Sequence, residues 1–147
     1  MWCHRFLDVF PGPGVQHIGL CTDDIQRTVS ILSHTGVQFR TPPPAYYSLV
    51  RLALTAQIQV IHFSFNHFKE EKTKQFRIST FSLERCKKLG ILIDTEEMDE
   101  KFLLQIFTKP MFKYDTFFME VIQRDGALGF GAGNIKALAL SISRIPN

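Results

Sequence analysis

TFFMEVIQR, residues 116–124, is an apolar run with a single carboxylate, Glu120, at its centre. Runs of this length and composition are typical of β-strands, in which alternate side chains point to opposite faces. Phe118 and Glu120 are therefore expected on one face. An ionised carboxylate among apolar neighbours is costly to bury unless it is paired or metal-bound, although an edge strand could leave it in water.

A second apolar run, GVQHIGL at residues 14–20, places His17 in a similar setting. Taken alone, such a histidine is more often a hydrogen-bonded core residue than a metal ligand. Together, however, a histidine and a glutamate are two of the three ligands of the 2-His-1-carboxylate arrangement that holds non-heme iron(II). His17 and Glu120 are thus candidate metal ligands, and a second histidine is needed.

Length and composition predict one globular domain. The chain has 147 residues, of which 45% are hydrophobic and 21% charged, and no apolar run reaches the roughly 18 residues of a membrane span. Three cysteines without CxxC spacing, Cys3, Cys21 and Cys86, favour free thiols in a reducing compartment. We therefore expect a cytoplasmic protein without a membrane partner, with the mitochondrion as the alternative.

The basic charge is local. Residues 68–88 carry a net charge of +4, which leaves −1 for the rest of the chain. No recognisable docking motif accompanies this cluster, so a solvated surface segment is favoured and no nucleic-acid partner is expected.

The pattern along the chain predicts a strand, a helix and further strands. Thr22, Asp23 and Asp24 supply N-cap chemistry, apolar residues then recur at helical spacing, and Gly36 ends the helix. The expected strands are Val15–Cys21, Val37–Arg40, Ile91–Asp94, Phe102–Thr108 and Thr116–Arg124, and Asn134 is expected to cap a final helix. Residues 50–89 follow neither period, apart from a strand-like run at 58–65, and are expected to be an insertion with its own elements or disordered.

Five motifs occur in one order along the chain. They are GPGVQHIGL at 12–20, TPPPAYY at 41–47, FLLQIFTKP at 102–110, FFMEVIQR at 117–124 and GFGAGN at 129–134. They resemble the last part of the 4-hydroxyphenylpyruvate dioxygenase family, over residues 12–48 and 90–144. The resemblance implies an α+β fold: a single βαβββ module of the vicinal oxygen chelate type at 12–144, with a C-terminal helix and an insertion at about 50–89.

The resemblance also implies a site. His17 and Glu120 match iron(II) ligands of the family. The matches to substrate-pocket residues are Gln105, Phe107, Phe118, Asn134, Ile135 and Gln16. Strand parity puts Gln105 and Phe107 on one face, as it does Phe118 and Glu120, but it puts Gln16 opposite His17.

What the resemblance implies for function is an oxidoreductase of aromatic amino acid metabolism, in tyrosine catabolism. Members of the family use iron(II) and O2 to decarboxylate and hydroxylate the 2-oxo acid 4-hydroxyphenylpyruvate, giving homogentisate or 4-hydroxymandelate. Ile135 stands where the ring-hydroxylating members carry phenylalanine, and this favours the dioxygenase-like branch. The alternatives are a catalytically inactive, metal-free binding or pairing module and a non-functional fragment.

The second histidine ligand is the missing part. In the family it belongs to a preceding module, and none of His4, His34, His62 and His67 has a matching context. We therefore expect an incomplete copy of the enzyme, and a partner in a second copy of the chain or in another βαβββ module.

Overall fold

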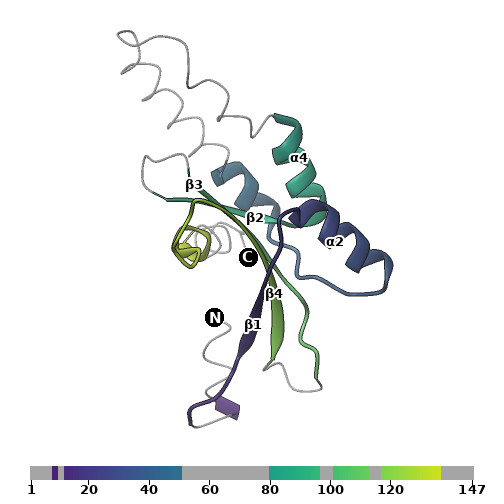
Figure 1. Cartoon of the computed structure of the whole chain (residues 1–147), viewed down its shortest axis with the longest axis vertical. Helices are drawn as coiled ribbons and strands as arrows, with labels where there is room; N and C mark the ends of the chain where they lie inside the picture. Colours follow the sequence, from purple (N-terminus) through teal and green to yellow (C-terminus); the bar gives the residue numbers. More distant parts are fainter. Residues whose placement is uncertain (1–7, 10–11, 51–79, 97–100, 113–116, 137–147) are drawn as a thin grey trace, which may run out of the picture.

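The computed structural model describes residues 8–9, 12–50, 80–96, 101–112 and 117–136 (Figure 1). Its regular elements are β1 (His17–Cys21), α2 (Ile25–His34), α4 (Thr80–Leu89), β2 (Leu92–Glu96), β3 (Lys101–Phe107) and β4 (Phe118–Asp125). Residues 44–50 and 132–136 are also helical. The expected strand at 58–65 lies outside the described residues, and the insertion at about 50–89 stays a prediction.

The four strands form one mixed sheet in the order β1-β4-β3-β2. β1 runs parallel to β4, whereas β4 with β3 and β3 with β2 are antiparallel. A strand, a helix and three further strands in this order confirm the expected α+β module. The predicted strand Val37–Arg40 was wrong in extent, because only Phe39 forms a bridge, to Thr108.

α2 is the element that the sequence specifies most completely. The Asp24 side chain accepts a hydrogen bond from the Arg27 N–H (2.9 Å) and so caps the first turn. At the other end Gly36 adopts a positive φ of 98°, and the Val37 and Gly36 N–H groups bond to the Leu32 and Ser33 carbonyls. This is the Schellman arrangement, which satisfies the last carbonyls of a helix.

Replacing Asp24 by alanine should lower the free energy of unfolding by about 1 kcal/mol, because the Arg27 N–H loses its acceptor. Urea denaturation measures this change. Asp23→Ala is the matched control, because it removes the neighbouring carboxylate and keeps the cap. Equal losses in the two variants would contradict the capping role.

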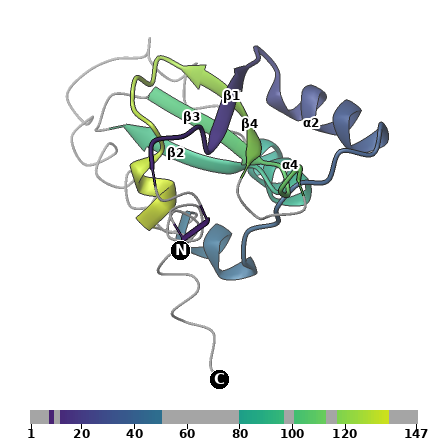
Figure 2. The same ribbon diagram turned by 90° about the horizontal axis from the view of Figure 1, so that it is seen from below.

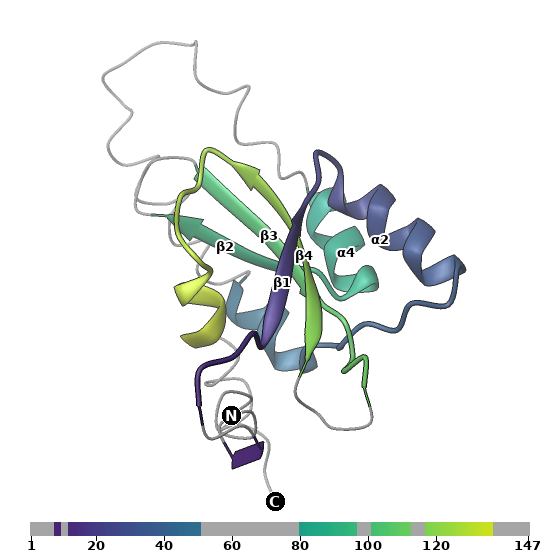
Figure 3. The ribbon, with the colours of Figure 1, turned by 60° about the horizontal axis from the view of Figure 1, so that its bottom comes forward.

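One face of the sheet packs against helices. α2 contacts β4 and α4, and α4 contacts β2; Figure 3 shows both helices on the same side of the sheet. The apolar core lies between these helices, residues 44–50 and the sheet, and consists of Ile25, Val29, Tyr46, Tyr47, Val50, Cys86, Ile91, Leu92, Ile93, Ile106 and Val121. The opposite face of the sheet is not covered by α2 or α4.

α4 corrects the view that residues 50–89 lack a regular period. Its Cys86 side chain is buried in the core, and the Tyr47 hydroxyl contacts the Cys86 carbonyl (3.4 Å). Gly90, with a φ of 78°, ends α4 by the same pair of backbone hydrogen bonds that ends α2. Cys21 and Cys86 are free thiols, and Cys3 is outside the described residues. No described helix has both the length and the apolarity needed to span a membrane.

The two edges of the sheet differ. β1 is one edge, and all five of its residues are exposed. β2 is the other edge, where the Tyr46 hydroxyl accepts a hydrogen bond from the Ile93 N–H (2.9 Å) and lies 3.1 Å from the Ile93 carbonyl oxygen. Residues 44–50 therefore cover part of the β2 edge.

Residues 127–136, called the C-terminal segment below, lie on the side of the sheet away from α2 and α4 (Figures 2 and 3). Its helix begins at residue 132, so Asn134 lies within the helix and is not its cap. The Asp94 carboxylate of β2 accepts a hydrogen bond from the Gly133 N–H (3.0 Å) instead. Leu138 and Ile142, expected on the apolar side of this helix, are outside the described residues.

Candidate metal centre

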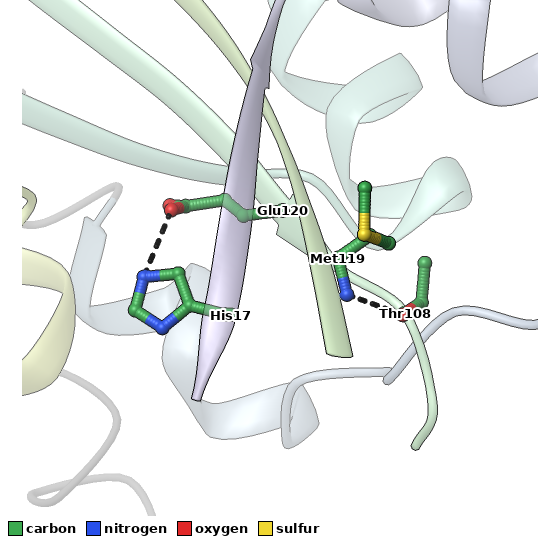
Figure 4. Close-up of polar contacts among 4 residues, drawn as sticks. All are labelled: His17, Thr108, Met119 and Glu120. Carbon is green, nitrogen blue, oxygen red and sulfur yellow. Dashed lines mark hydrogen bonds and ion pairs between the residues drawn. The ribbon is translucent and has the colours of Figure 1, made fainter. Parts of the chain in front are cut away.

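His17 and Glu120 come together because β1 and β4 are parallel neighbours. Gly19 pairs with Glu120 and His17 with Phe118, so the His17 and Glu120 side chains share one face of the sheet. His17 Nε2 lies 3.6 Å from Glu120 Oε2 (Figure 4). A Cβ at Gly19 would lie only 3.2 Å from Ile122 Cδ1 and in ordinary contact, 3.7 Å, with Glu120 Oε2.

The pair fits a shared metal ion. Two donor atoms that each lie about 2.1 Å from one ion are roughly 3–4 Å apart, depending on the angle between them. The observed 3.6 Å is within that range, and a neutral imidazole and a carboxylate are both usual ligands of iron(II). The His17 side chain is 41% exposed and that of Glu120 is 11% exposed, so solvent reaches the pair mainly from the side of the histidine.

A third ligand is absent from the part of the chain that the structure describes. No described group of three or more His, Cys, Asp or Glu residues is placed to hold a metal ion. His34 is at the end of α2, where its Nδ1 lies 2.7 Å from the Ser30 carbonyl oxygen. His4, His62 and His67 are outside the described residues.

Glu120 is electrostatically unusual. Burial raises its pKa to about 7, and the Arg124 charge offsets part of this rise. Arg124 itself donates to the Ala127 and Gly129 carbonyls, at 3.1 and 2.7 Å, and thereby holds the loop that follows β4. A carboxyl with this pKa is largely protonated in slightly acidic solution and becomes a better ligand as the pH rises.

Aromatic rings surround the pair. The Phe118 ring stacks on the His17 imidazole, with centroids 5.0 Å apart and planes 8° from parallel. Phe107 pairs with Glu120 across β3 and β4, and its ring meets Phe118 edge to face at 5.7 Å. Both phenylalanines thus lie beside the candidate ligands, and stacking restrains the imidazole ring; their place in a substrate pocket stays a prediction.

Gln105 and Asn134 are buried residues that each have a side-chain atom without a hydrogen-bond partner. Gln105 is 2% exposed and its Oε1 has no hydrogen-bond partner. Asn134 is 1% exposed, its Oδ1 is 2.5 Å from the Tyr46 hydroxyl, and its Nδ2 has no partner. Leaving buried polar atoms unpaired costs about 1–3 kcal/mol each, so both atoms are candidates for contact with a ligand.

The two remaining expected pocket residues are placed differently. Gln16 precedes β1 and contributes its backbone, since its carbonyl accepts from the Phe118 N–H (3.2 Å). The Ile135 side chain is 58% exposed. The structure thus brings His17, Glu120, Phe107 and Phe118 directly together, and Gln16 joins them through its backbone carbonyl.

Sequence reasoning missed three residues that shape the region. Asp94 and Tyr46 hold the C-terminal segment through Gly133 and Asn134. Gly131 lies against Gln105, where a Cβ would come within 2.1 Å of Oε1. Tyr46 is part of the TPPPAYY motif and Gly131 part of GFGAGN, so the motifs pointed to them without indicating what they contact.

No family model matches the chain. Among curated proteins, it is 42% identical over 138 residues to the 4-hydroxyphenylpyruvate dioxygenase of Tetrahymena thermophila, which covers 94% of this chain and 30% of that protein. It is 39% identical to the human 4-hydroxyphenylpyruvate dioxygenase-like protein, over 94% of this chain and 31% of that protein. The two identities are close, so placement in the dioxygenase-like branch stays a prediction.

Solved structures agree with the sequence comparison. A mutant of 4-hydroxymandelate synthase from Streptomyces coelicolor superposes with a TM-score of 0.66 and 35% identity, over 95% of this chain and 33% of that one. A fusion protein of a xylose isomerase-like TIM barrel and 4-hydroxyphenylpyruvate dioxygenase shares the fold, with a TM-score of 0.61. The chain spans about 30% of the length of the curated relatives that it matches. In sequence and in fold, it is a single vicinal oxygen chelate module related to 4-hydroxyphenylpyruvate dioxygenase and its like proteins.

Proposed function

We propose that this chain is the metal-binding module of an iron(II)-dependent oxygenase that acts on 4-hydroxyphenylpyruvate. The observation that carries the proposal is the 3.6 Å approach of His17 Nε2 to Glu120 Oε2 on a sheet face lined by aromatic rings. The relatives named above, a dioxygenase and a hydroxymandelate synthase, support an oxidoreductase that uses a small 2-oxo acid and O2.

In this proposal each side chain has a limited task. His17 and Glu120 hold the metal ion, and Phe118 keeps the imidazole in position by stacking. Phe107 and Phe118 exclude water from one side of the pair, which strengthens electrostatic interactions there. Bound iron(II) would supply open positions for the oxo acid and for O2. Gln105 and Asn134 offer polar atoms to the substrate.

The third ligand, a second histidine, comes from outside the described residues in this proposal. It is supplied by one of the remaining histidines of the chain, by a second copy or by another βαβββ module. The product, homogentisate or 4-hydroxymandelate, depends on how the substrate ring is held, and Ile135 in place of phenylalanine removes an aromatic contact worth about 0.5–1.5 kcal/mol.

A metal-free binding or pairing module is the second candidate. The observation that favours it is that the described residues contain two candidate ligands and no third. The fully exposed β1 edge suits a module that pairs with another.

Metal titration separates the two candidates. Anaerobic calorimetry with Fe²⁺ should show one ion per chain, and His17→Ala should weaken binding at least tenfold because one ligand is removed. His34→Ala is the matched control and should bind like the wild type, since His34 lies on α2 away from Glu120. Binding that is absent in the wild type, or unchanged in His17→Ala, would favour the metal-free module. Oxygen uptake with 4-hydroxyphenylpyruvate then tests whether the chain turns over.

A further inference from the structure

The Tyr46 hydroxyl connects three parts of the molecule. It belongs to residues 44–50, it binds the backbone of Ile93 at the β2 edge, and it lies 2.5 Å from Asn134 Oδ1. The Tyr46 side chain is fully buried, and the Tyr47 ring packs against it edge to face at 5.0 Å. Its position is therefore fixed independently of Asn134.

The hydrogen-bond pattern determines which way the Asn134 amide faces. The Tyr46 oxygen accepts the Ile93 N–H, and of the two acceptors near its own proton Asn134 Oδ1, at 2.5 Å, is closer than the Ile93 carbonyl oxygen, at 3.1 Å. Burial also raises the pKa of this hydroxyl, which keeps it protonated. The amide must then present its oxygen to Tyr46, and the Asn134 NH2 group is left as a buried donor without a partner.

A second contact holds the same segment without Tyr46. The Asp94 carboxylate accepts from the Gly133 N–H at 3.0 Å, and the Ile135 N–H bonds to the Gly131 carbonyl. The backbone around Asn134 thus keeps two of its hydrogen bonds when the Tyr46 hydroxyl is removed. Within this segment the hydroxyl controls the orientation of the Asn134 amide, and its other hydrogen bonds are to the Ile93 backbone.

We propose that Tyr46 is a positioning residue, which sets the Asn134 amide so that Nδ2 donates a hydrogen bond to an oxygen of a bound aromatic 2-oxo acid. The inference rests on the proposed function, because it needs that ligand. A ligand oxygen that reaches Nδ2 pairs a buried donor that is otherwise unsatisfied, which favours binding. The oxygen belongs either to the phenol or to the oxo-acid end of the ligand.

The hydroxyl of Tyr47 provides a matched control. It is also buried, and it bonds to the Ile91 carbonyl at 3.1 Å, but it faces α4 and not the C-terminal segment. Tyr46→Phe and Tyr47→Phe each remove a buried hydroxyl, and only the first frees Asn134 and the Ile93 N–H. Asn134→Asp is a second test, because it keeps an oxygen for Tyr46 and removes the N–H donor.

The experiment is calorimetric titration of the full chain with 4-hydroxyphenylpyruvate, in the presence of Fe²⁺ and without oxygen. Tyr46→Phe and Asn134→Asp should bind the ligand roughly fivefold to tenfold more weakly than the wild type, and Tyr47→Phe should not. A titration with phenylpyruvate, which lacks the phenol oxygen, shows whether Asn134 contacts the phenol or the oxo-acid end of the ligand. A loss with both ligands assigns the contact to the oxo-acid end, and a loss with 4-hydroxyphenylpyruvate alone assigns it to the phenol.

Two other results have separate meanings. If the wild type binds and Tyr46→Phe binds equally well, or if Tyr47→Phe loses as much, the positioning role is overturned and the proposed function stands. If the wild type does not bind the ligand, the proposed function fails and this inference fails with it. The side-chain amide resonances of Asn134 in the ligand-free chain add a direct readout, and they should shift in Tyr46→Phe but not in Tyr47→Phe.

Discussion

Replacing Glu120 by glutamine should raise the free energy of unfolding of the metal-free chain by about 1–3 kcal/mol at pH 8. Burial raises the pKa of this carboxyl from 4.5 to about 7, so between these values the folded chain keeps a proton that the unfolded chain releases. Stability from this group is therefore fully present below about pH 4.5 and is lost as the pH rises through 7. Glutamine keeps the shape of the neutral form and avoids that loss.

Urea denaturation at several pH values measures the effect. The advantage of Glu120→Gln should be small near pH 4.5 and should grow until about pH 7, the raised pKa of the carboxyl. Glu84→Gln on α4 is the matched control, because it makes the same replacement at an exposed position. A Glu120→Gln variant less stable than the wild type at pH 8 would show that the carboxylate is paired in the metal-free fold.

The same substitution should act in the opposite direction on metal binding. Loss of the candidate carboxylate ligand should weaken Fe²⁺ binding by at least about a hundredfold. A saturating metal stabilises the chain that binds it, so added Fe²⁺ should raise the midpoint of wild-type unfolding and leave that of Glu120→Gln unchanged. Glu120 would then be retained at a cost in stability because of its function.

Replacing Gly131 by alanine should lower the free energy of unfolding by about 2–5 kcal/mol. Its φ of 78° is strained for alanine by roughly 1–2 kcal/mol. The added Cβ would also lie 2.1 Å from Gln105 Oε1 and 2.9 Å from Cδ of the same side chain. Because Gln105 is buried, relieving that overlap costs about 1–3 kcal/mol more.

Two other glycines separate the backbone and steric contributions. Gly36→Ala places an alanine at a φ of 98°, and nothing lies within 4 Å of the new Cβ. This variant should therefore show the backbone cost alone. At Gly133 the φ is not in the positive region, but a Cβ would lie 2.1 Å from Asp94 Oδ1, so its replacement should show the steric cost alone. Thermal or urea unfolding of the three variants measures these losses. A loss in Gly131→Ala no larger than in Gly36→Ala would mean that Gln105 moves aside freely.

The parts of the fold that the sequence predicted are those that local chemistry determines. α2 has an N-cap at Asp24, buried residues at helical spacing and Gly36 after its last turn, and its bounds were predicted closely. The strands β3 and β4 lie close to the predicted bounds Phe102–Thr108 and Thr116–Arg124. α4 was missed because only Leu83, Cys86 and Leu89 mark its apolar side within a highly charged segment. Gly90 directly after Leu89 was the available signal, since the same arrangement ends α2.

The candidate site was only partly predictable, because local chemistry determines only part of its geometry. Parity within one strand placed Phe118 with Glu120 on a common face. The approach of His17 to Glu120 depends on the parallel register of two strands about a hundred residues apart, which no local pattern contains. The contact between Tyr46 and Asn134 likewise joins residues 88 positions apart, and only the fold brings them together.

The difference between the two sheet edges limits how copies of this module can assemble. Tyr46 occupies the backbone groups of Ile93, so the β2 edge is partly closed to strand addition. The β1 edge has no strand beside it among the described residues. Association through β1 against β1 would use up the open edge of both copies and so end at a symmetric pair. Growth into a continuous filament would require the β2 edge, which residues 44–50 obstruct.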